Sequence, residues 1–427
     1  MTAHELRKVL YVFADWEEVN GPVFAGWLTA NRVRGKEVFA FEYSKDWLKS
    51  PHAAVLDPGL GLFQGPQFPA PDHANFGAFL DSSPDRWGRV LLRRREAVMA
   101  RAEQRPERNL FETDFLLGVY DRHRMGGLRF KLQPEGPFLD DNHQFAAPPW
   151  TSLRQLESIS MRLEEEDAQS NPEYFAWLKM LVAPGASLGG ARPKASVVDE
   201  EGQLWIAKFP SIGDGDDVGA WEFVAHRLAL RSGIQMAACR LMRFSSRHHT
   251  FLAERFDRSP SGRRKHFASA MTHLGFVDGQ EGASYLDIVD FITTNGAEVG
   301  TDLAQLYRRM VFNMAISNAD DHLRNHGFLL TPGGWRLSPA YDLNPVETAT
   351  TLHLNVSDSD NACDWRLALE VATFFRLTDS DARRIIHEVL KAVECWQDEA
   401  EAVGLSRSAC ERKARAFRTE WLSELGR

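Results

Sequence analysis

The sequence is poor in cysteine and has no long apolar run. Its 427 residues include only four cysteines, Cys239, Cys363, Cys395 and Cys410, and none of them forms a Cys-x-x-Cys pair. This spacing argues against a disulfide framework and a zinc site, and favours a reduced, cytoplasmic protein. No stretch approaches the roughly 20 apolar residues that cross a bilayer. Because Met1–Ala14 is too charged for a signal peptide, we expect neither export nor a membrane partner.

The chain also lacks an excess of basic charge. Lys and Arg number 50 against 59 Asp and Glu, a formal net charge of -9. Such a balance argues against a general nucleic-acid binder. Two local basic triplets, Arg93–Arg95 and Arg263–Lys265, are expected to be solvated faces, with nucleic-acid contact as the alternative.

The chain has enough apolar residues to form several hydrophobic cores. Hydrophobic residues make up 44%, including 12 Trp and 27 Phe, which bury much area per residue. The length exceeds that of one usual domain. Strand patterns dominate the first part and helical patterns the last, which predicts an α+β fold with a mixed N-terminal lobe and a mainly helical C-terminal lobe. The clearest predicted strands are 9–14, 37–43, 195–198 and 204–209, and the clearest predicted helices are 83–95, 152–166, 218–232, 303–316, 381–403 and 406–425.

The strongest chemical motif is the run SNADDHLRN at 317–325, which follows a long apolar helix. Asp320 and Asn325 are five positions apart, the spacing of the base and the metal-binding Asn in a kinase catalytic loop. A carboxylate can orient the attacking hydroxyl, and an amide oxygen is a hard ligand that suits magnesium. The spacing predicts Asp320 as the catalytic acid and Asn325 as a Mg²⁺ ligand.

A second metal-binding acid is predicted downstream. Two short strands, 328–330 and 335–337, flank a Pro-Gly-Gly turn and are followed by Asp342. Kinases place their second metal-binding Asp after a comparable hairpin. Asp342 is therefore a predicted Mg²⁺ ligand, although its setting, Tyr-Asp-Leu, differs from Asp-Phe-Gly and argues against an ordinary protein-kinase domain.

The phosphates of ATP also need a cation. Lys208 is the one charge in the apolar strand LWIAKF, which is similar to the V-A-I-K strand of kinases. Glu222, in the next predicted helix, is placed to orient it. The small-residue loop 185–194 precedes these strands, and small residues let backbone N–H groups approach phosphate oxygens.

Each of these residues has a plainer structural interpretation, and their joint occurrence in kinase order favours chemistry. The alternatives are helix capping for Asn318, Asp320 and Asp321, an edge-strand charge for Lys208, a turn for Asp342, an exposed helix acid for Glu222, an ordinary loop around Ser187, and a structural role for His322.

The same residues resemble the HipA family, the kinase toxins of bacterial type II toxin–antitoxin modules. The most specific stretches are NADDHLRNHGF and LSPAYDLNP, followed by SLGGARPK, WIAKFP and LAERFDR. N-terminal stretches such as FGAFLDSSPDRWGR and DFLLGVYDRHRMGGLRF are similar to the family's N-terminal subdomain. The resemblance therefore covers nearly the whole chain.

The resemblance implies roles for further residues. It implies a serine/threonine kinase that uses ATP and Mg²⁺, with a hinge at Glu254 and Phe256 that meets adenine. It also implies self-phosphorylation at Ser187, aminoacyl-tRNA synthetases as targets, and neutralisation by a HipB-like helix-turn-helix antitoxin whose complex binds operator DNA. The candidate ATP contacts are Ser187, Gly189, Gly190, Lys194, Lys208, Glu222, Glu254, Phe256 and His322.

The sequence thus predicts a HipA-type protein kinase in four parts. These are an N-terminal subdomain at 1–131, a linker at 132–150, a nucleotide-binding part at 151–256 and a helical catalytic lobe at 257–427. The alternatives left open are a small-molecule phosphotransferase, a nucleotide-binding co-repressor without turnover and, more weakly, a metal phosphohydrolase that uses Asp320, Asp321 and His322.

Overall fold

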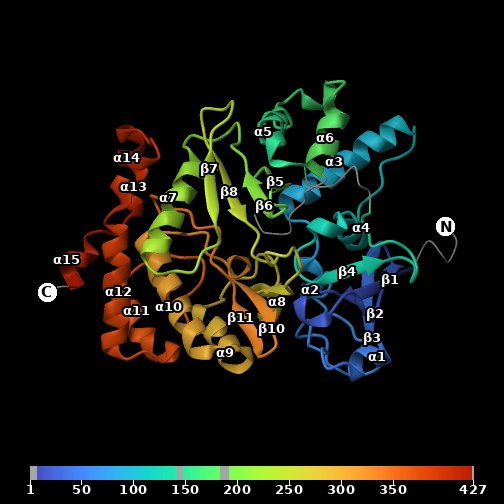
Figure 1. Cartoon of the computed structure of the whole chain (residues 1–427), viewed down its shortest axis with the longest axis horizontal. Helices are drawn as coiled ribbons and strands as arrows, with labels where there is room; N and C mark the ends of the chain where they lie inside the picture. The colour runs from blue at the N-terminus through green and yellow to red at the C-terminus, as the bar shows by residue number, and fades with distance from the viewer. Residues whose placement is uncertain (1–6, 142–147, 183–191, 426–427) are drawn as a thin grey trace. The chain divides into compact units, whose positions relative to one another are not determined.

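The structure, a computed structural model of the chain, describes residues 7–141, 148–182 and 192–425. They divide into two units (Figure 1). Unit 1 consists of Met1–Ile212 and Asp257–Val277, and unit 2 consists of Gly213–Phe256 and Asp278–Arg427. The chain therefore crosses between the units three times. The crossings follow Ile212, Phe256 and Val277, so the second coincides with the predicted boundary at 256, and the functional division into four parts stays a prediction.

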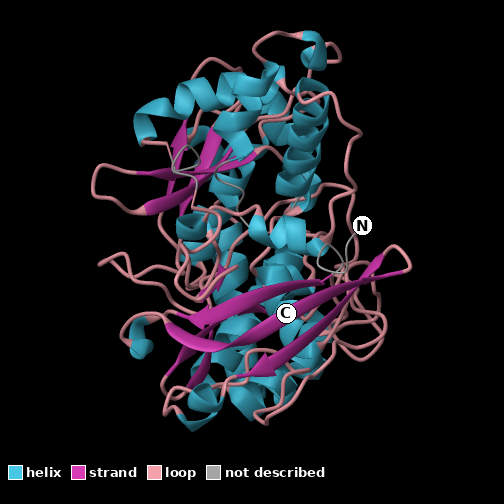
Figure 2. Ribbon diagram, turned by 90° about the vertical axis from the view of Figure 1, so that its right-hand side faces the viewer, coloured by secondary structure: helices cyan, strands magenta, loops and turns pink. Residues whose placement is uncertain are grey.

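Unit 1 begins with an antiparallel sheet of strand order β3-β2-β1-β4. Its strands are β1 (Arg7–Ala14), β2 (Val23–Val33), β3 (Lys36–Tyr43) and β4 (Leu128–Lys131), and the long magenta arrows in the lower half of Figure 2 belong to this sheet. Leu10, Val12 and Ala14 alternate along β1 and are fully buried, as expected for a sheet with one covered face. The predicted strands 9–14 and 37–43 are confirmed, whereas the long β2 between them was not predicted.

Helices and a hairpin complete unit 1. α3 begins at Asp85, whose side chain accepts a hydrogen bond from Gly88 N at 2.7 Å, so the predicted helix start is confirmed. The remaining elements are α1 (Lys45–Lys49), α2 (Gly77–Asp81), α3 (Arg86–Ala102), α4 (Glu112–Leu117), α5 (Leu153–Arg162), α6 (Tyr174–Val182), the paired strands β5 (Lys194–Val198) and β6 (Leu204–Lys208), β9 (Phe267–Ser269) and α8 (Ala270–Leu274).

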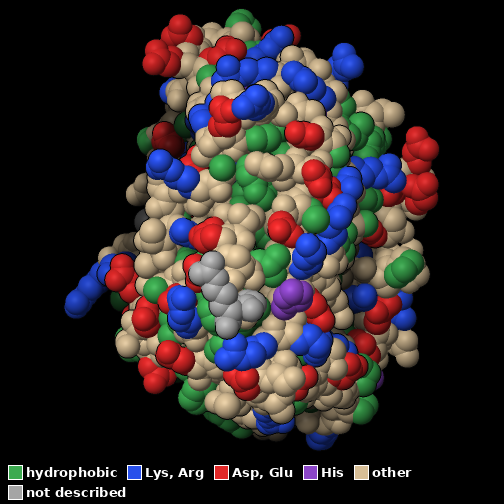
Figure 3. All heavy atoms as spheres, turned by 90° about the vertical axis from the view of Figure 1, so that its left-hand side faces the viewer, with side chains coloured by type: hydrophobic (Ala, Val, Ile, Leu, Met, Phe, Trp, Pro, Cys, Tyr) green, Lys and Arg blue, Asp and Glu red, His purple; other side chains and the backbone are tan. Residues whose placement is uncertain are grey.

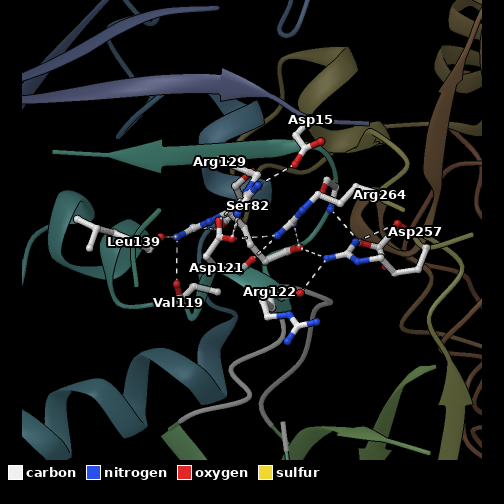
Figure 4. A network of polar contacts seen from close by, with 12 residues as sticks. Asp15, Ser82, Val119, Asp121, Arg122, Arg129, Leu139, Asp257 and Arg264 are labelled. Carbon is white, nitrogen blue, oxygen red and sulfur yellow. Dashed lines mark hydrogen bonds and ion pairs between the residues drawn. The ribbon is translucent and has the colours of Figure 1, made fainter. Parts of the chain in front are cut away.

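A buried arginine holds the loops of unit 1 together (Figure 4). The Arg124 guanidinium is fully buried and donates to four backbone carbonyls, those of Ser82, Leu116, Val119 and Leu139, at 2.8 to 3.1 Å. Burial lowers the pKa of Arg124 to about 9. Since Leu139 lies within the predicted linker 132–150, the described start of that segment is bound to the body of unit 1.

Two arginines from the later part of unit 1 extend this network. Arg258 donates to Arg124 O at 2.8 Å, and Arg264 donates to Arg124 O at 3.1 Å and to Asp121 O at 2.5 Å. Arg264 is only 9% exposed. The expectation that the triplet 263–265 is a solvated face is therefore wrong for its middle residue, because the guanidinium of that residue is bonded to carbonyls inside the fold (Figure 4).

Unit 2 is mainly helical with two hairpins. Its longest helix, α10, has a fully buried face that includes Leu303, Leu306 and Met310, which confirms the predicted helix 303–316. The elements are α7 (Val218–Arg231), β7 (Cys239–Met242), β8 (Thr250–Glu254), α9 (Tyr285–Asn295), α10 (Val299–Ala315), β10 (Gly327–Thr331), β11 (Gly334–Leu337), α11 (Trp365–Val371), α12 (Asp379–Val393), α13 (Trp396–Ala402), α14 (Arg407–Lys413) and α15 (Trp421–Leu425).

The two long C-terminal helices predicted from the sequence are each broken. The predicted helix 381–403 turns at Glu394 and Cys395 and becomes α12 and α13. The predicted helix 406–425 ends at Lys413, and Phe417 adopts an extended backbone. Trp396 and Phe417, which follow the two breaks, stack on each other with their ring centroids 4.5 Å apart.

The C-terminal helices also pack against α7. Trp221 in α7 lies 6.3 Å from Trp396, and the buried Glu399 carboxylate forms ion pairs with Arg227 and Arg231 of α7. The surface over these helices mixes basic and acidic side chains (Figure 3). Ion pairs between such exposed groups contribute little, whereas the pairs on buried Glu399 fix α7 in place.

Two expectations about the whole chain concern cysteines and membranes. All four cysteines are free thiols, which confirms the absence of disulfides among them. Within the described ranges, no helix has both the length and the apolar character needed to cross a bilayer.

Candidate functional site

The motif 317–325 forms a tight loop after α10. Asp320 is exposed, whereas Asn325 is buried. The Asn325 side chain donates from Nδ2 to Asp320 O at 2.9 Å, and its backbone N–H donates to His322 O at 2.8 Å. The five-residue spacing thus becomes a direct contact, in which Asn325 closes the loop that presents the Asp320 carboxylate.

Three buried polar atoms in this loop lack a partner among the described residues, namely Ser317 Oγ and two that bear on the site. Asn325 Oδ1 and His322 Nδ1 are buried and have no hydrogen-bond partner among the described residues. A buried acceptor without a partner is costly unless something else binds it. The Asn325 oxygen therefore fits a Mg²⁺ ligand, and His322, whose ring lies 6.1 Å from that of His353, fits either a structural or a ligand-contacting role.

The segment that carries Asp342 is bonded to this loop. Asp342 has a left-handed backbone with φ of 59° and accepts a hydrogen bond from Asn344 Nδ2 at 3.3 Å. Tyr341 donates from its hydroxyl to Arg324 O at 2.6 Å, and Asn344 N donates to Asn318 Oδ1 at 3.3 Å. Both predicted metal-binding segments therefore lie side by side within unit 2.

These segments offer oxygen ligands of two kinds. The described residues hold no group of three or more His, Cys, Asp and Glu side chains able to bind a metal. The predicted set differs in kind, since it consists of the amide oxygen of Asn325 and the carboxylate of Asp342. Magnesium accepts such a mixed set, because it keeps several waters and substrate phosphates among its ligands.

The predicted adenine hinge adjoins the same segments. Glu254 ends β8, and its backbone N–H donates to Ala238 O at 2.8 Å. The Phe256 ring lies 5.5 Å from the Tyr341 ring. Tyr341 therefore contacts both the predicted hinge and the loop 317–325, and the role of Glu254 and Phe256 toward adenine stays a prediction.

A buried carboxylate underlies the loop. Asp321 is 1% exposed and accepts hydrogen bonds from His326 Nε2 at 2.8 Å and from the Tyr285 hydroxyl. Burial opposes ionisation, but the charge and hydrogen bond of His326, with the Tyr285 bond, outweigh it and hold the pKa of Asp321 below its ordinary value. Burial and the Asp321 charge raise the pKa of Tyr285, which keeps its proton.

The hydrogen bonds of Tyr285 and His326 to Asp321 were not predicted from the sequence. The sequence indicates only a helix cap or a hydrolase ligand for Asp321, and it does not single out Tyr285 or Asn313. One signal was present, since Asn313 interrupts the apolar run Val311–Ile316. A polar side chain at such a position is buried and needs a specific partner.

The two predicted lysines of unit 1 face each other. Lys194 in β5 and Lys208 in β6 are directly opposite in the ladder, so their side chains share one face of the hairpin. The Lys194 ammonium forms an ion pair with Asp85 at 2.9 Å, and both side chains are buried. Burial raises the pKa of Asp85 despite the nearby lysine. Lys194 as an ATP contact stays a prediction, and its observed partner is Asp85.

Glu222 lies on the buried side of α7 and is 5% exposed. Burial and the Glu222 charge raise the pKa of Cys239 to about 12, so Cys239 in β7 is a neutral thiol close to this carboxylate. The exposed-acid alternative for Glu222 is therefore wrong, while its role toward Lys208 stays a prediction. Ser187, Gly189 and Gly190 lie outside the described residues.

The Asp85–Lys194 pair predicts a stability effect. Asp85→Asn keeps a helix-capping side chain but removes the carboxylate charge that faces the buried Lys194 ammonium, so urea denaturation should show a loss of about 3–5 kcal/mol in the free energy of unfolding. The double variant Asp85→Asn/Lys194→Met should recover much of that loss. Equal stability of Asp85→Asn and the wild type would contradict the structural role of the pair.

Comparison with known proteins agrees with this geometry. Residues 186–396 match the HipA-like C-terminal domain family. A curated relative, the serine/threonine-protein kinase toxin HipA of Shewanella oneidensis, is 29% identical over 146 residues. That match spans 30% of this chain and 34% of the relative, about a third of its length.

A solved structure shares the fold over nearly the whole length. It is the HipA chain of a complex of HipA, HipB and operator DNA from Shewanella oneidensis, with a TM-score of 0.67, 18% identity, and coverage of 97% of this chain and 96% of that chain. This likeness confirms the predicted fold class, with a mixed N-terminal part and a mainly helical C-terminal part. Residues 186–396 therefore belong to the HipA-like C-terminal domain family, and the described chain shares the fold of that solved structure over nearly its whole length.

Proposed function

We propose that this protein is an ATP-dependent kinase that transfers the γ-phosphoryl group to a Ser or Thr hydroxyl of a protein. The main support for this proposal is the buried Asn325 Oδ1, which has no hydrogen-bond partner in the described part of the chain. Asn325 belongs to the loop that presents Asp320. The Asp342 segment is hydrogen-bonded to that same loop. Such an oxygen set suits a divalent cation on phosphates.

Each residue then has a defined task. Asn325 and Asp342 would hold Mg²⁺, which neutralises charge on the phosphates when it is bound. The exposed Asp320 carboxylate accepts a hydrogen bond from the substrate hydroxyl and orients it for attack. Lys208 donates to the phosphates, with Glu222 as its orienting partner, and the Glu254–Phe256 hinge contacts adenine. Catalysis of this kind rests on positioning and electrostatics.

The substrate class follows from the family and not from the site. The relative from Shewanella oneidensis bears the name of a serine/threonine-protein kinase, which favours a protein over a metabolite. Within proteins, the family resemblance suggests an aminoacyl-tRNA synthetase. The small-molecule alternative predicts labelled metabolites and no labelled protein in a host lysate, so one labelling experiment separates the two.

The first prediction removes the proposed catalytic charges. Asp320→Asn and Asp342→Asn should each lower transfer of labelled γ-phosphate to lysate proteins by at least about 100-fold, since each change removes a charge needed in the transition state. Asp398→Asn, an exposed acid on α13, should stay within twofold of the wild type. Full activity of Asp320→Asn would refute its assignment.

The second prediction concerns self-phosphorylation. If Ser187 is the acceptor, as the family resemblance suggests, the wild type incubated with ATP and Mg²⁺ gains the mass of one phosphate and Ser187→Ala gains none. Intact-mass spectrometry measures this directly. A phosphate retained on Ser187→Ala would assign the modification to another residue.

We also propose a regulatory partner. The solved structure with the same fold was determined with HipB and operator DNA, and a HipB-like antitoxin is the corresponding partner for this chain. The tagged chain purified from its host should carry a helix-turn-helix protein, and the mixture should retard that protein's operator DNA in a gel. A chain that purifies alone and does not alter retardation would contradict this partnership.

A further inference from the structure

A row of hydrogen bonds, most of them between buried side chains, joins the two segments that carry the candidate metal ligands. At one end, Asn344 donates from Nδ2 to the Asp342 carboxylate at 3.3 Å and from its backbone N–H to Asn318 Oδ1 at 3.3 Å. Asn318 Nδ2 in turn donates to Asn313 Oδ1 at 3.2 Å. The contact therefore passes from the Asp342 segment through the loop into helix α10.

The row continues to the residue beside the catalytic acid. Asn313 Nδ2 donates to the Tyr285 hydroxyl at 3.0 Å, and that hydroxyl donates to Asp321 Oδ2. His326 Nε2 donates to the other oxygen of Asp321 at 2.8 Å. Asp321 follows Asp320 directly, and His326 follows Asn325, so this end of the row holds both sides of the catalytic loop.

The hydrogen bonds run outward from Asn344, which donates to Asp342 with Nδ2 and to Asn318 with its backbone N–H. Asn318 and Asn313 each accept with the amide oxygen and donate with the amide nitrogen, and the tyrosine accepts from Asn313 and donates to Asp321. The only groups that accept alone are the two carboxylates, Asp342 and Asp321. From Asn318 to Asp321 the bonds all point in one direction, so each bond polarises the next.

Burial makes this row rigid. Tyr285 is fully buried, Asn313, Asn318 and Asp321 are each 1% exposed, and His326 is 2% exposed. Water cannot replace a lost partner at such positions, so removing one member leaves neighbouring donors and acceptors unpaired. None of these five side chains is needed to touch ATP, yet together they link helices α9 and α10 to both ligand segments.

We propose that Asn344, Asn318, Asn313, Tyr285 and Asp321, which we name the amide relay, are positioning residues that fix the spacing between Asp342 and the Asp320–Asn325 loop. The inference rests on the proposed function, because the spacing matters only if both segments hold one cation. A ligand set held at its working separation binds the ion without reorganisation, so loosening the relay weakens metal binding before it affects nucleotide contacts.

The test compares substitutions at two fully buried tyrosines, one inside the amide relay and one outside it. Tyr285→Phe removes the hydroxyl inside the relay. Tyr307→Phe removes a hydroxyl that is equally buried in unit 2 but donates to Ala368 O at 2.9 Å, outside the relay. Binding of Mn²⁺ with a non-hydrolysable ATP analogue, followed by the electron paramagnetic resonance signal of free Mn²⁺, should weaken about tenfold for Tyr285→Phe.

The matched control keeps a structural effect apart from a positioning effect. Tyr307→Phe should lose thermal stability as Tyr285→Phe does, but should keep Mn²⁺ affinity within twofold of the wild type. In activity assays, Tyr285→Phe should lower kcat and raise the Mg²⁺ requirement, with the KM for ATP at saturating Mg²⁺ unchanged. Equal changes in metal affinity for both variants, or no change for either, would overturn the proposal.

A second variant covers the case in which Tyr285→Phe does not fold. Asn344 is only partly buried, and Asn344→Ala removes the bond to Asp342 while the backbone N–H to Asn318 remains. It should also weaken Mn²⁺ binding, and unchanged affinity would overturn the proposal. A wild type that binds Mn²⁺ and nucleotide but transfers no phosphate would refute the kinase proposal alone, whereas a wild type that binds no Mn²⁺ would refute both.

Discussion

A single buried carboxylate sets the conditions for the candidate site. Ionised Asp321 is almost fully excluded from water, and such a charge is tolerated only if each of its oxygens is bonded. Tyr285 from the start of α9 and His326 from the end of the loop supply those bonds. The position of the loop after α10 is therefore coupled to a second helix and to the start of β10, before any nucleotide is considered.

The two adjacent acids of the motif consequently lie in different environments. Asp321 is buried and bonded to protein partners, whereas Asp320 is exposed. Unit 1 follows the same principle with the opposite charge, since Arg124 and Arg264 use buried guanidinium groups to bind carbonyls of loops distant in sequence. In both units a desolvated charge fixes irregular backbone that regular secondary structure cannot hold.

Local patterns were sufficient for much of the fold. The helices predicted at 83–95, 218–232 and 303–316, and the hairpin predicted at 328–337, follow from apolar periodicity, caps and turn residues, all of which act within a few positions. In the structure α3 continues to Ala102 and α10 begins at Val299. The breaks at Glu394 and after Lys413 do not, because they depend on the stacking of Trp396 with Phe417 and on the pairing of Glu399 with α7. No local pattern encodes a contact that forms only after the helices pack.

The sequence by itself determined the residue types and their order: a strand that carries Lys208, a helix that carries Glu222, the D-x-x-x-x-N loop and the later Asp342. These are chemical identities, and folding cannot change them. Only the tertiary structure decided which of two neighbouring acids is exposed, that Lys194 pairs with Asp85, and that Tyr285 and Asn313 support the loop. Those outcomes depend on burial and on hydrogen bonds between segments far apart in the chain, and their free energies arise only when the segments meet in the folded protein.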